Sequence, residues 1–483
     1  MVRWSGLAPT VYVFFLAAIV LLSGCGPSVS RYVLIEQHLR AGDPAQAASV
    51  VERAEDEYGA NSRVLYGMDR GLTLQLAGDY RESNRVLEQA DELIERLYTR
   101  TIRSETAAFL TNDNALPYEG DPYEHVMVNV VKALNYAAQG DVTEALVEVR
   151  RIDHRLNVLG DRVKESEGYR RDGFARYVSG ILYEAAGDIN NAFIAYRHAF
   201  DAYQAMHGWS RVAPPSSLHA DLLSTAEALG LADEFEAYRK QFAGIDWDSV
   251  SVRRQLAQVV MISYNGRAPR KEDRYLDLPI SLDALQLVLL NRGLSYSIGR
   301  QDRAVDSVLY GLSGRVVRVA LPRLVSQKTQ AAVETMTLTD SQGRSHTVRS
   351  EPVQNVTALA EKSLDARMPA ITVKALARAA TKFSMAEGAV IGAKIAAGRD
   401  AAPLVGLLVG LMAKGLAVAS EEADKRSWQT LPDEIHVARA WVPAGRYQVA
   451  VQPAGRGTVA GSAEPSLDLS PGQTVFLIRR VMP

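Results

Sequence analysis

Few residues of this chain have types and spacings suited to reaction chemistry, and the most prominent is Cys25, the only cysteine among 483 residues. Its thiolate can form a thioether bond, whereas a single cysteine forms no internal disulfide. No two of the eight histidines lie within one helical turn of each other, so the sequence shows no paired metal ligands. Walker, Gly-x-Ser-x-Gly and His-Glu-x-x-His motifs are also absent. We predict no catalytic residue, no metal and no cofactor.

The residues before Cys25 have the order of a secretory signal. Arg3 is followed by an apolar run over 11–22 and then by the small residues Ser23 and Gly24. A cysteine directly after this ending resembles the lipobox of bacterial lipoproteins, in which that cysteine becomes the lipidated first residue. We predict a signal peptide over 1–24, a diglyceride and palmitate on Cys25, and a short tether over 25–31. The alternatives are an uncleaved membrane anchor, for which the run is short, and a cysteine placed there by chance.

The residue after the cysteine bears on location. In lipoprotein sorting an Asp at that position retains the protein in the inner membrane, and this chain has Gly26 instead. We therefore predict an outer-membrane anchor facing the periplasm, with the inner membrane less favoured. The formal net charge of −2 gives no electrostatic signature of nucleic-acid binding, so we predict envelope proteins and the membrane as partners.

The composition of the chain is that of a globular protein, with 47% hydrophobic and 23% charged residues. From about residue 32 to 246 the chain is predicted to be helical, with recurring turns in which a Gly ends one helix and an Asp caps the next. The turns are Ala41-Gly42-Asp43, Ala77-Gly78-Asp79, Gln139-Gly140-Asp141, Ala186-Gly187-Asp188 and the weaker Leu229-Gly230.

Small and aromatic residues around these turns resemble the tetratricopeptide repeat, an α-solenoid of paired helices. The resemblance implies a concave face built from the first helix of each pair. Aligning the turn glycines places these partner-binding candidates on it: Met68, Gln75, Met127, Phe174, Tyr177 and Glu184. The face is mostly apolar, which suits a helix or an apolar peptide. The alternative is that the chain fills the groove with its own residues.

An acidic loop interrupts the repeats over 112–124. Its Asp113, Glu119, Asp121 and Glu124 could gather around calcium, which prefers oxygen ligands, or form a solvated acidic loop. The spacing is not that of an EF-hand.

The C-terminal half, 247–483, is predicted to be an antiparallel β domain with a helical insert over 353–422. The predicted strands are 259–264, 315–321, 332–338, 345–349, 435–442, 447–451 and 475–479. The insert has the four-residue glycine pairs Gly388/Gly392 and Gly406/Gly410, which allow two helices to approach closely. We expect that helix pair, 388–419, either to pack on the protein or to enter a membrane. The fold class is therefore α+β and multidomain, with an N-terminal solenoid.

Several runs together resemble an uncharacterised family of predicted bacterial lipoproteins with tetratricopeptide-like repeats. They are Pro117-Tyr118-Glu119-Gly120 with Tyr123-Glu124, Ala133-Leu134-Asn135-Tyr136, Val147-Glu148-Val149-Arg150-Arg151, Tyr264-Asn265-Gly266-Arg267-Ala268-Pro269-Arg270-Lys271 and Arg426-Ser427-Trp428-Gln429. Arg270 stands where that family's pattern would have a Lys. The resemblance implies an envelope location and no activity or site residues.

We predict a non-enzymatic, lipid-anchored periplasmic scaffold that binds partner proteins through its helical repeats. One alternative is a component of a secretion or export complex whose Gly-rich hairpin enters a membrane. A second alternative is an envelope hydrolase, because buried carboxylate pairs are not visible in a sequence.

Overall fold

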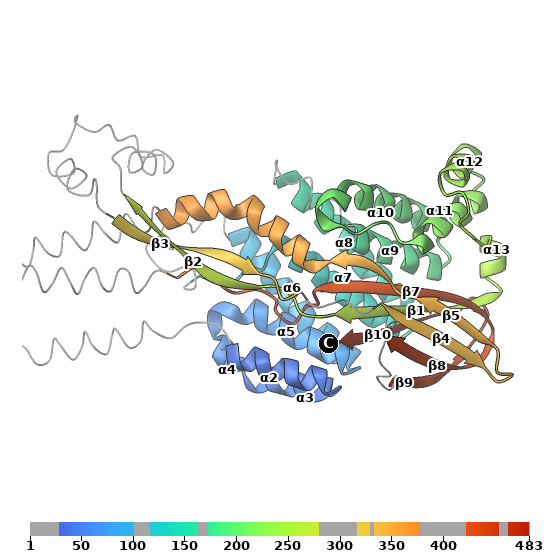
Figure 1. The fold of residues 1–483 in the computed structure, drawn as a ribbon, viewed down its shortest axis with the longest axis horizontal. Coiled ribbons are helices and arrows are strands. Elements are labelled where there is room, and N and C mark those ends of the chain that lie inside the picture. Colours follow the sequence, from blue (N-terminus) through green and yellow to red (C-terminus); the bar gives the residue numbers. More distant parts are fainter. Residues whose placement is uncertain are drawn as a thin grey trace, which may run out of the picture.

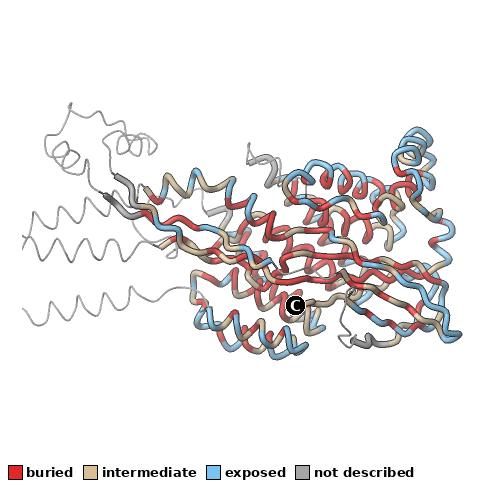
Figure 2. The backbone as a smooth tube through the Cα atoms, viewed as in Figure 1, coloured by how far each residue is buried: buried red, intermediate tan, exposed pale blue. Residues whose placement is uncertain are grey.

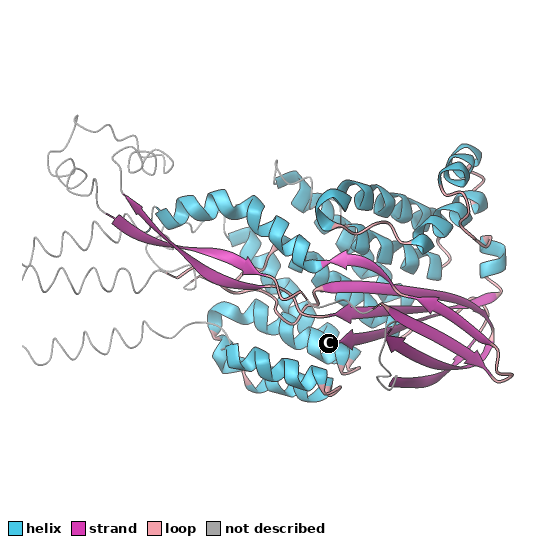
Figure 3. Ribbon diagram, viewed as in Figure 1, coloured by secondary structure: helices cyan, strands magenta, loops and turns pink. Residues whose placement is uncertain are grey.

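The computed structural model describes residues 29–100, 116–162, 172–279, 316–328, 333–376, 378, 422–453 and 462–482. Cys25, Asp113 and the predicted glycine-rich helix pair, 388–419, lie outside these residues. Within the described part, helices come first along the chain and strands dominate the second half (Figure 3). This order agrees with the predicted α+β class.

The helices of the N-terminal half form consecutive pairs. They are α2 (Val29–Arg40), α3 (Pro44–Arg53), α4 (Glu55–Tyr58), α5 (Arg63–Leu76), α6 (Tyr80–Arg100), α7 (Pro122–Ala138), α8 (Val142–Arg162), α9 (Gly173–Ala185), α10 (Ile189–Ser210), α11 (Ser216–Ala228), α12 (Ala232–Gln241) and α13 (Val250–Arg253), with a short 3-10 turn η1 (Ala60–Ser62). The predicted turn chemistry is confirmed: Gly78 and Gly140 have φ of 81° and 79°, and Asp188 accepts from the Asn191 amide at 3.1 Å.

Ten strands form three sheets. The strands are β1 (Leu256–Asn265), β2 (Arg270–Pro279), β3 (Val316–Val325), β4 (Glu334–Asp340), β5 (Ser345–Arg349), β6 (Glu351–Asn355), β7 (Glu434–Pro443), β8 (Gly445–Pro453), β9 (Ser462–Leu469) and β10 (Thr474–Val481), counted over the described ranges. The central sheet has the order β10-β1-β7-β6, the outer sheet has the order β5-β4-β8-β9, and β2 pairs with β3 in a two-stranded ribbon.

The described residues pack in three layers: helices, central sheet and outer sheet (Figure 1). Successive side chains of a strand point to opposite faces. Val260 and Ile262 of β1 therefore pack against the helices, while Val259 and Met261 pack against the outer sheet. The buried residues consequently run through the middle of the molecule (Figure 2). One hydrophobic cluster contains side chains from both halves of the chain.

The sheet differs from the prediction in three respects. The central sheet is mixed, because β10 pairs with β1 in parallel, with Gln258 opposite Thr474. The predicted start of the helical insert at residue 353 is wrong, since β6 occupies 351–355 and the helix begins at 356. Strands β2 and β9 were not predicted, because their charged or Pro-containing sequences lack a run of β-branched residues.

The ribbon extends away from the body of the molecule on the left of Figure 1. A helix over 356–376, unlabelled in that view, covers one face of it. Val319 and Leu321 of β3 pack there against Ala375. A two-stranded ribbon alone is marginally stable, so this helix supplies the packing that it needs.

The close approach of paired helices depends on small residues such as Gly180 of α9. A Cβ atom at this position would lie 2.4 Å from the ring of Tyr196 on α10. That ring is fully buried, and its hydroxyl donates to Glu184 at 2.6 Å. The ring therefore has little freedom to move aside.

We expect Gly180→Ala to lower the free energy of unfolding by about 1–3 kcal/mol, because it overpacks the contact between α9 and α10. Gly208→Ala is the matched control, since Gly208 is also helical and a Cβ there would have nothing within 4 Å. It should be neutral or stabilising by up to about 1 kcal/mol. Urea unfolding measures both, and equal stabilities would contradict the overpacking argument.

Candidate functional site

Three of the six predicted partner-binding residues, Gln75, Tyr177 and Glu184, contact the chain's own central sheet, and the other three are part of the hydrophobic core. All six come from the first helix of three successive pairs, and Met68, Met127, Phe174 and Tyr177 are each 0% exposed. The amide oxygen of Gln75 accepts from the Tyr264 hydroxyl of β1 at 3.1 Å. The C-terminal half of the chain thus covers this face, so the chain fills its own groove. Partner binding at this face stays a prediction, and a partner would have to displace the sheet.

A buried ionic cluster lies at the α9 and α11 end of this covered face. Arg253 Nη1 lies 2.8 Å from both Glu184 Oε1 and Asp221 Oδ1. Arg439 of β7 contacts the same two carboxylates and donates to the Tyr177 hydroxyl at 2.9 Å. Burial alone would raise the pKa of Glu184, but the two guanidinium groups outweigh it and lower that pKa. With two positive and two negative charges, the cluster fixes the sheet on the helices.

A second buried carboxylate, Asp69 on α5, receives hydrogen bonds from three elements. The hydroxyls of Tyr32 and Tyr58 donate to Oδ2, each at 2.8 Å. Thr430 donates to Oδ1 at 2.7 Å. Thr430 belongs to residues 422–433, which we call the crossing segment because they cross the helices before β7. Burial raises the pKa of Asp69 to about 6, and the hydrogen bonds limit this rise.

Glu124 holds the same crossing segment from the start of α7. Its carboxylate accepts from the Tyr118 hydroxyl at 2.6 Å and from the Trp428 amide at 2.8 Å. Burial and the neighbouring charge of Asp121 raise the pKa of Glu124 to about 7.

Both interpretations of the acidic loop are wrong for its described carboxylates at the start of α7. Asp121 and Glu124 are 2% and 0% exposed, so they are not solvated. They form the capping box of α7, and Asp121 pairs with Lys271 at 3.2 Å and Arg367 at 2.7 Å. No group of three or more His, Cys, Asp or Glu residues among the described residues could hold a metal ion. The carboxylates serve the protein's own cations and amides.

On the second helices of two neighbouring pairs, α6 and α8, lies a charged cleft with a cavity of about 450 Å³. It is lined by Glu88, Asp91, Glu92, Glu95, Arg96, Arg151, His154 and Arg155. The acidic residues come from α6, whereas α8 supplies two arginines and a histidine. The sheet packs against the first helices, so this cleft lies outside the covered face.

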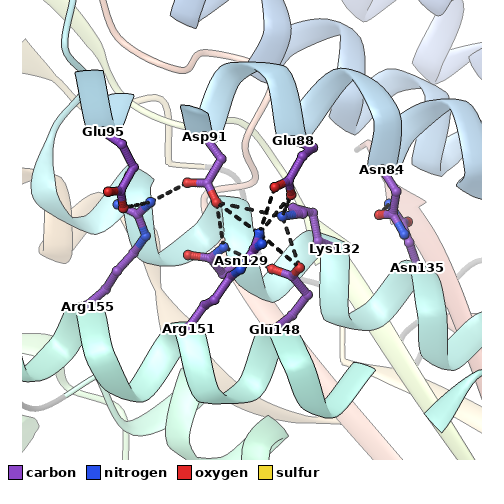
Figure 4. A network of polar contacts seen from close by, with 10 residues as sticks. All are labelled: Asn84, Glu88, Asp91, Glu95, Asn129, Lys132, Asn135, Glu148, Arg151 and Arg155. Atoms are coloured by element: carbon purple, nitrogen blue, oxygen red, sulfur yellow. Dashed lines mark hydrogen bonds and ion pairs between the residues drawn. The ribbon is translucent and has the colours of Figure 1, made fainter. Parts of the chain in front are cut away.

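A buried lysine of α7, Lys132, lies beneath the cleft (Figure 4). Its side chain is 1% exposed, and its ammonium lies 3.0 Å from Glu148 Oε1 and 3.7 Å from Asp91 Oδ2. It also contacts Glu88. The amide of Asn129 donates to Asp91 at 3.1 Å and to Glu148 at 3.0 Å. Lys132 is thus the buried cation of this network, and Arg151 and Arg155 of α8 contact the same carboxylates from the cleft side.

The rim of the cleft continues this pairing. Arg151 Nη1 lies 2.8 Å from Glu88 Oε2, and Arg155 pairs with Asp91 and, at 3.2 Å, with Glu95. Hydrogen bonds from Arg151 and Lys132 outweigh burial and lower the pKa of Glu88. Side chains arranged in this way can recognise a polar partner, and the lining has no hydroxyl or thiol nucleophile.

This cleft was not predicted from the sequence. A signal was present: Glu88, Asp91, Glu92 and Glu95 recur with spacings of three and four residues, which places them on one side of a helix. Arg151 and Arg155 do the same four residues apart. The acidic row of α6 and the arginines of α8 come together only through the packing of the repeats, which the sequence alone does not specify.

No known protein family matches the chain, and no curated protein matches it. Solved structures that are similar include a Podosopora anserina kinesin light chain with nearly identical TPR-like repeats, with 16% identity, TM-score 0.30, and coverage of 45% of this chain and 93% of that one. MamA of Desulfovibrio magneticus RS-1 has 14% identity and TM-score 0.27, with 44% of this chain and 90% of that chain covered. At these scores the likeness carries no functional argument. The lipoprotein resemblance stays a prediction.

A search of the described helices for an apolar stretch long enough to cross a membrane finds none. Cys25, with its predicted lipidation, and the predicted helix pair over 388–419 lie outside the described residues.

We expect Lys132→Met to destabilise the protein by about 3 kcal/mol, because the buried Glu148 would keep only the partly exposed Arg151 as a cation partner. Arg85→Ala is the control, since Arg85 also pairs with a carboxylate of α6, Glu82, but has a side chain that is 57% exposed. Exposed pairs contribute little, so the control should unfold like the unmodified chain. Similar urea midpoints for the two variants would show that the buried network contributes no more than an exposed pair.

The raised pKa of Asp69 predicts a pH dependence that Asp69→Asn removes. At pH 5 the folded state holds a proton on Asp69 that the unfolded state has lost, so this carboxyl contributes more stability at pH 5 than at pH 8. The unfolding free energy of the unmodified chain minus that of the variant should therefore increase by about 1 kcal/mol when the pH falls from 8 to 5.

Other groups that titrate in this window cancel in that difference. Burial lowers the pKa of His125 to about 4, for example, which acts in the opposite direction in both proteins. Urea unfolding at several pH values measures the difference. A difference that stays constant or shrinks as the pH falls would contradict the raised pKa.

Proposed function

We propose that the chain is a lipid-anchored scaffold of the cell envelope, held by Cys25 at the periplasmic face of the outer membrane. In this role it binds partner proteins and catalyses no reaction. The observation that carries the binding role is the cleft between α6 and α8, which is charged and is not filled by the chain itself. The concave face is less suited, because the central sheet covers it.

The charges of the cleft favour a polar protein segment as the partner. Glu92 and Glu95 are exposed at the rim, while the deeper carboxylates already have cations from Lys132, Arg151 and Arg155. Exposed charges at the rim of a binding site chiefly set specificity and association rate. Buried charges without a partner would instead require a ligand with one charge at one position. A protein surface with alternating charges fits this arrangement.

The tether supports a location close to the membrane. Helix α2 begins at Val29, so only residues 26–28 separate it from Cys25. Gly26 keeps the outer membrane the favoured location over the inner one.

Reversing the rim charge of the cleft tests the binding role. We expect Glu92→Arg combined with Glu95→Arg to reduce, several-fold, the recovery of proteins crosslinked to the chain in intact envelopes, as quantified by mass spectrometry. Glu234→Arg with Glu236→Arg is the matched control, because it makes the same charge change on the exposed helix α12. Crosslinked proteins that are recovered equally from both variants would overturn the cleft as the binding site.

A further inference from the structure

Of the six large apolar side chains that are exposed among the described residues, four lie at one end of the molecule. The six are Val29 (69% exposed), Val33 (46%), Leu116 (36%), Ile194 (36%), Val252 (44%) and Tyr275 (51%). Ile194 on α10 and Val252 on α13 lie apart from the others. Of the remaining four, Val29 and Val33 belong to the start of α2, Leu116 to the segment before α7, and Tyr275 to β2 of the ribbon. Helix α4 and the ribbon lie on the left of Figure 1.

Ion pairs and hydrogen bonds connect the segments that carry these four residues. Arg31 pairs with Glu57, which joins the first turn of α2 to α4. The Tyr118 amide donates to the Asn61 carbonyl at 2.7 Å, which places the segment that contains Leu116 just beyond α4.

The crossing segment continues the connection to the ribbon. Arg426 Nη1 donates to the carbonyls of Asn61 and Leu116 at 2.9 and 3.0 Å. Lys425 lies 2.9 Å from Asp273 of β2, two residues before Tyr275. Leu116 and Tyr275 therefore belong to the same end as α2 and α4.

On α2, the exposed apolar side chains are confined to the turns next to the predicted anchor. Val29 and Val33 are four residues apart and share the exposed side of the helix, which continues with Gln37 and Arg40. The stripe thus changes from apolar to polar with distance from Cys25.

We propose that this end of the molecule rests on the bilayer surface, with Val29 and Val33 in contact with the lipid headgroup region. The inference rests on the proposed lipidation of Cys25. An extended chain spans at most about 3.6 Å per residue, so residues 26–28 hold Val29 within roughly 14 Å of the lipidated residue. A helix this close to its lipid must lie beside the membrane, and the side it exposes there is apolar.

The contact is apolar rather than electrostatic. The neighbouring helix α4 exposes Glu55, Asp56 and Glu57, which do not attract anionic lipids. Two valines also bury too little area to hold a protein on a bilayer by themselves. The contact should therefore need the lipid anchor and should not depend on salt.

The single cysteine of the chain gives a direct test. Once the sulfur of Cys25 is in a thioether, an introduced cysteine is the only free thiol. We would attach a nitroxide to Val29→Cys and Val33→Cys of the lipidated protein in phosphatidylethanolamine and phosphatidylcholine vesicles. Arg40→Cys, at the far end of α2, and Ile194→Cys, on α10, are matched controls.

We expect the ratio of oxygen to water-soluble nickel collisions to be several-fold higher at 29 and 33 than at 40 and 194, with or without added salt. Equal ratios in protein that floats with the vesicles would overturn the membrane contact while leaving the anchor in place. Protein that fails to float would overturn the anchor as well. If the nitroxides at 29 and 33 are protected from nickel without vesicles, and this protection rises with protein concentration, a second copy of the chain covers α2. That result would also overturn the proposal.

Discussion

The arrangement of the whole chain depends on the burial of β1 on both of its faces. Every residue of β1 after Leu256 is buried, because helices cover one face and the outer sheet covers the other. A strand buried on both sides needs apolar residues at successive positions, and the run from Val259 to Ile262 supplies them. The concave face of the helical repeats thereby becomes the wall of a core. Side chains that would line an open groove in a free solenoid, such as Phe174 and Tyr177, are core residues here.

The polar residues of the structure divide according to this constraint. Where the helices meet the sheet, the cluster of Arg253, Arg439, Glu184 and Asp221 is buried, and its opposite charges pair with one another. Where the helices face away from the sheet, charged rows are partly exposed, as in the cleft of α6 and α8. The buried cluster connects the helices to the sheet. Only the partly exposed charges of the cleft are available to another molecule.

Local chemistry could be predicted from the sequence, and non-local pairing could not. The Gly-Asp turns of the repeats were predictable, because each depends on a few adjacent residues. The hairpin of β4 and β5 was predictable for the same reason. The parallel pairing of β10 with β1 was not, because nothing in either strand specifies a partner more than two hundred positions away. The roles of Asp121 and Glu124 were missed likewise, since Lys271, Arg367 and Trp428 reach them from distant segments.

The parallel pairing of β10 with β1 also sets the order in which the chain can fold. Helices and their turns form from local contacts, so the repeats can assemble while later residues are still arriving. The central sheet is complete only when β10, Thr474–Val481, has paired with β1. Until then Phe476 is absent from the core, and the apolar wall of the helices stays partly uncovered. During that interval the chain exposes apolar surface, and such incompletely packed chains are prone to aggregate until β10 has paired.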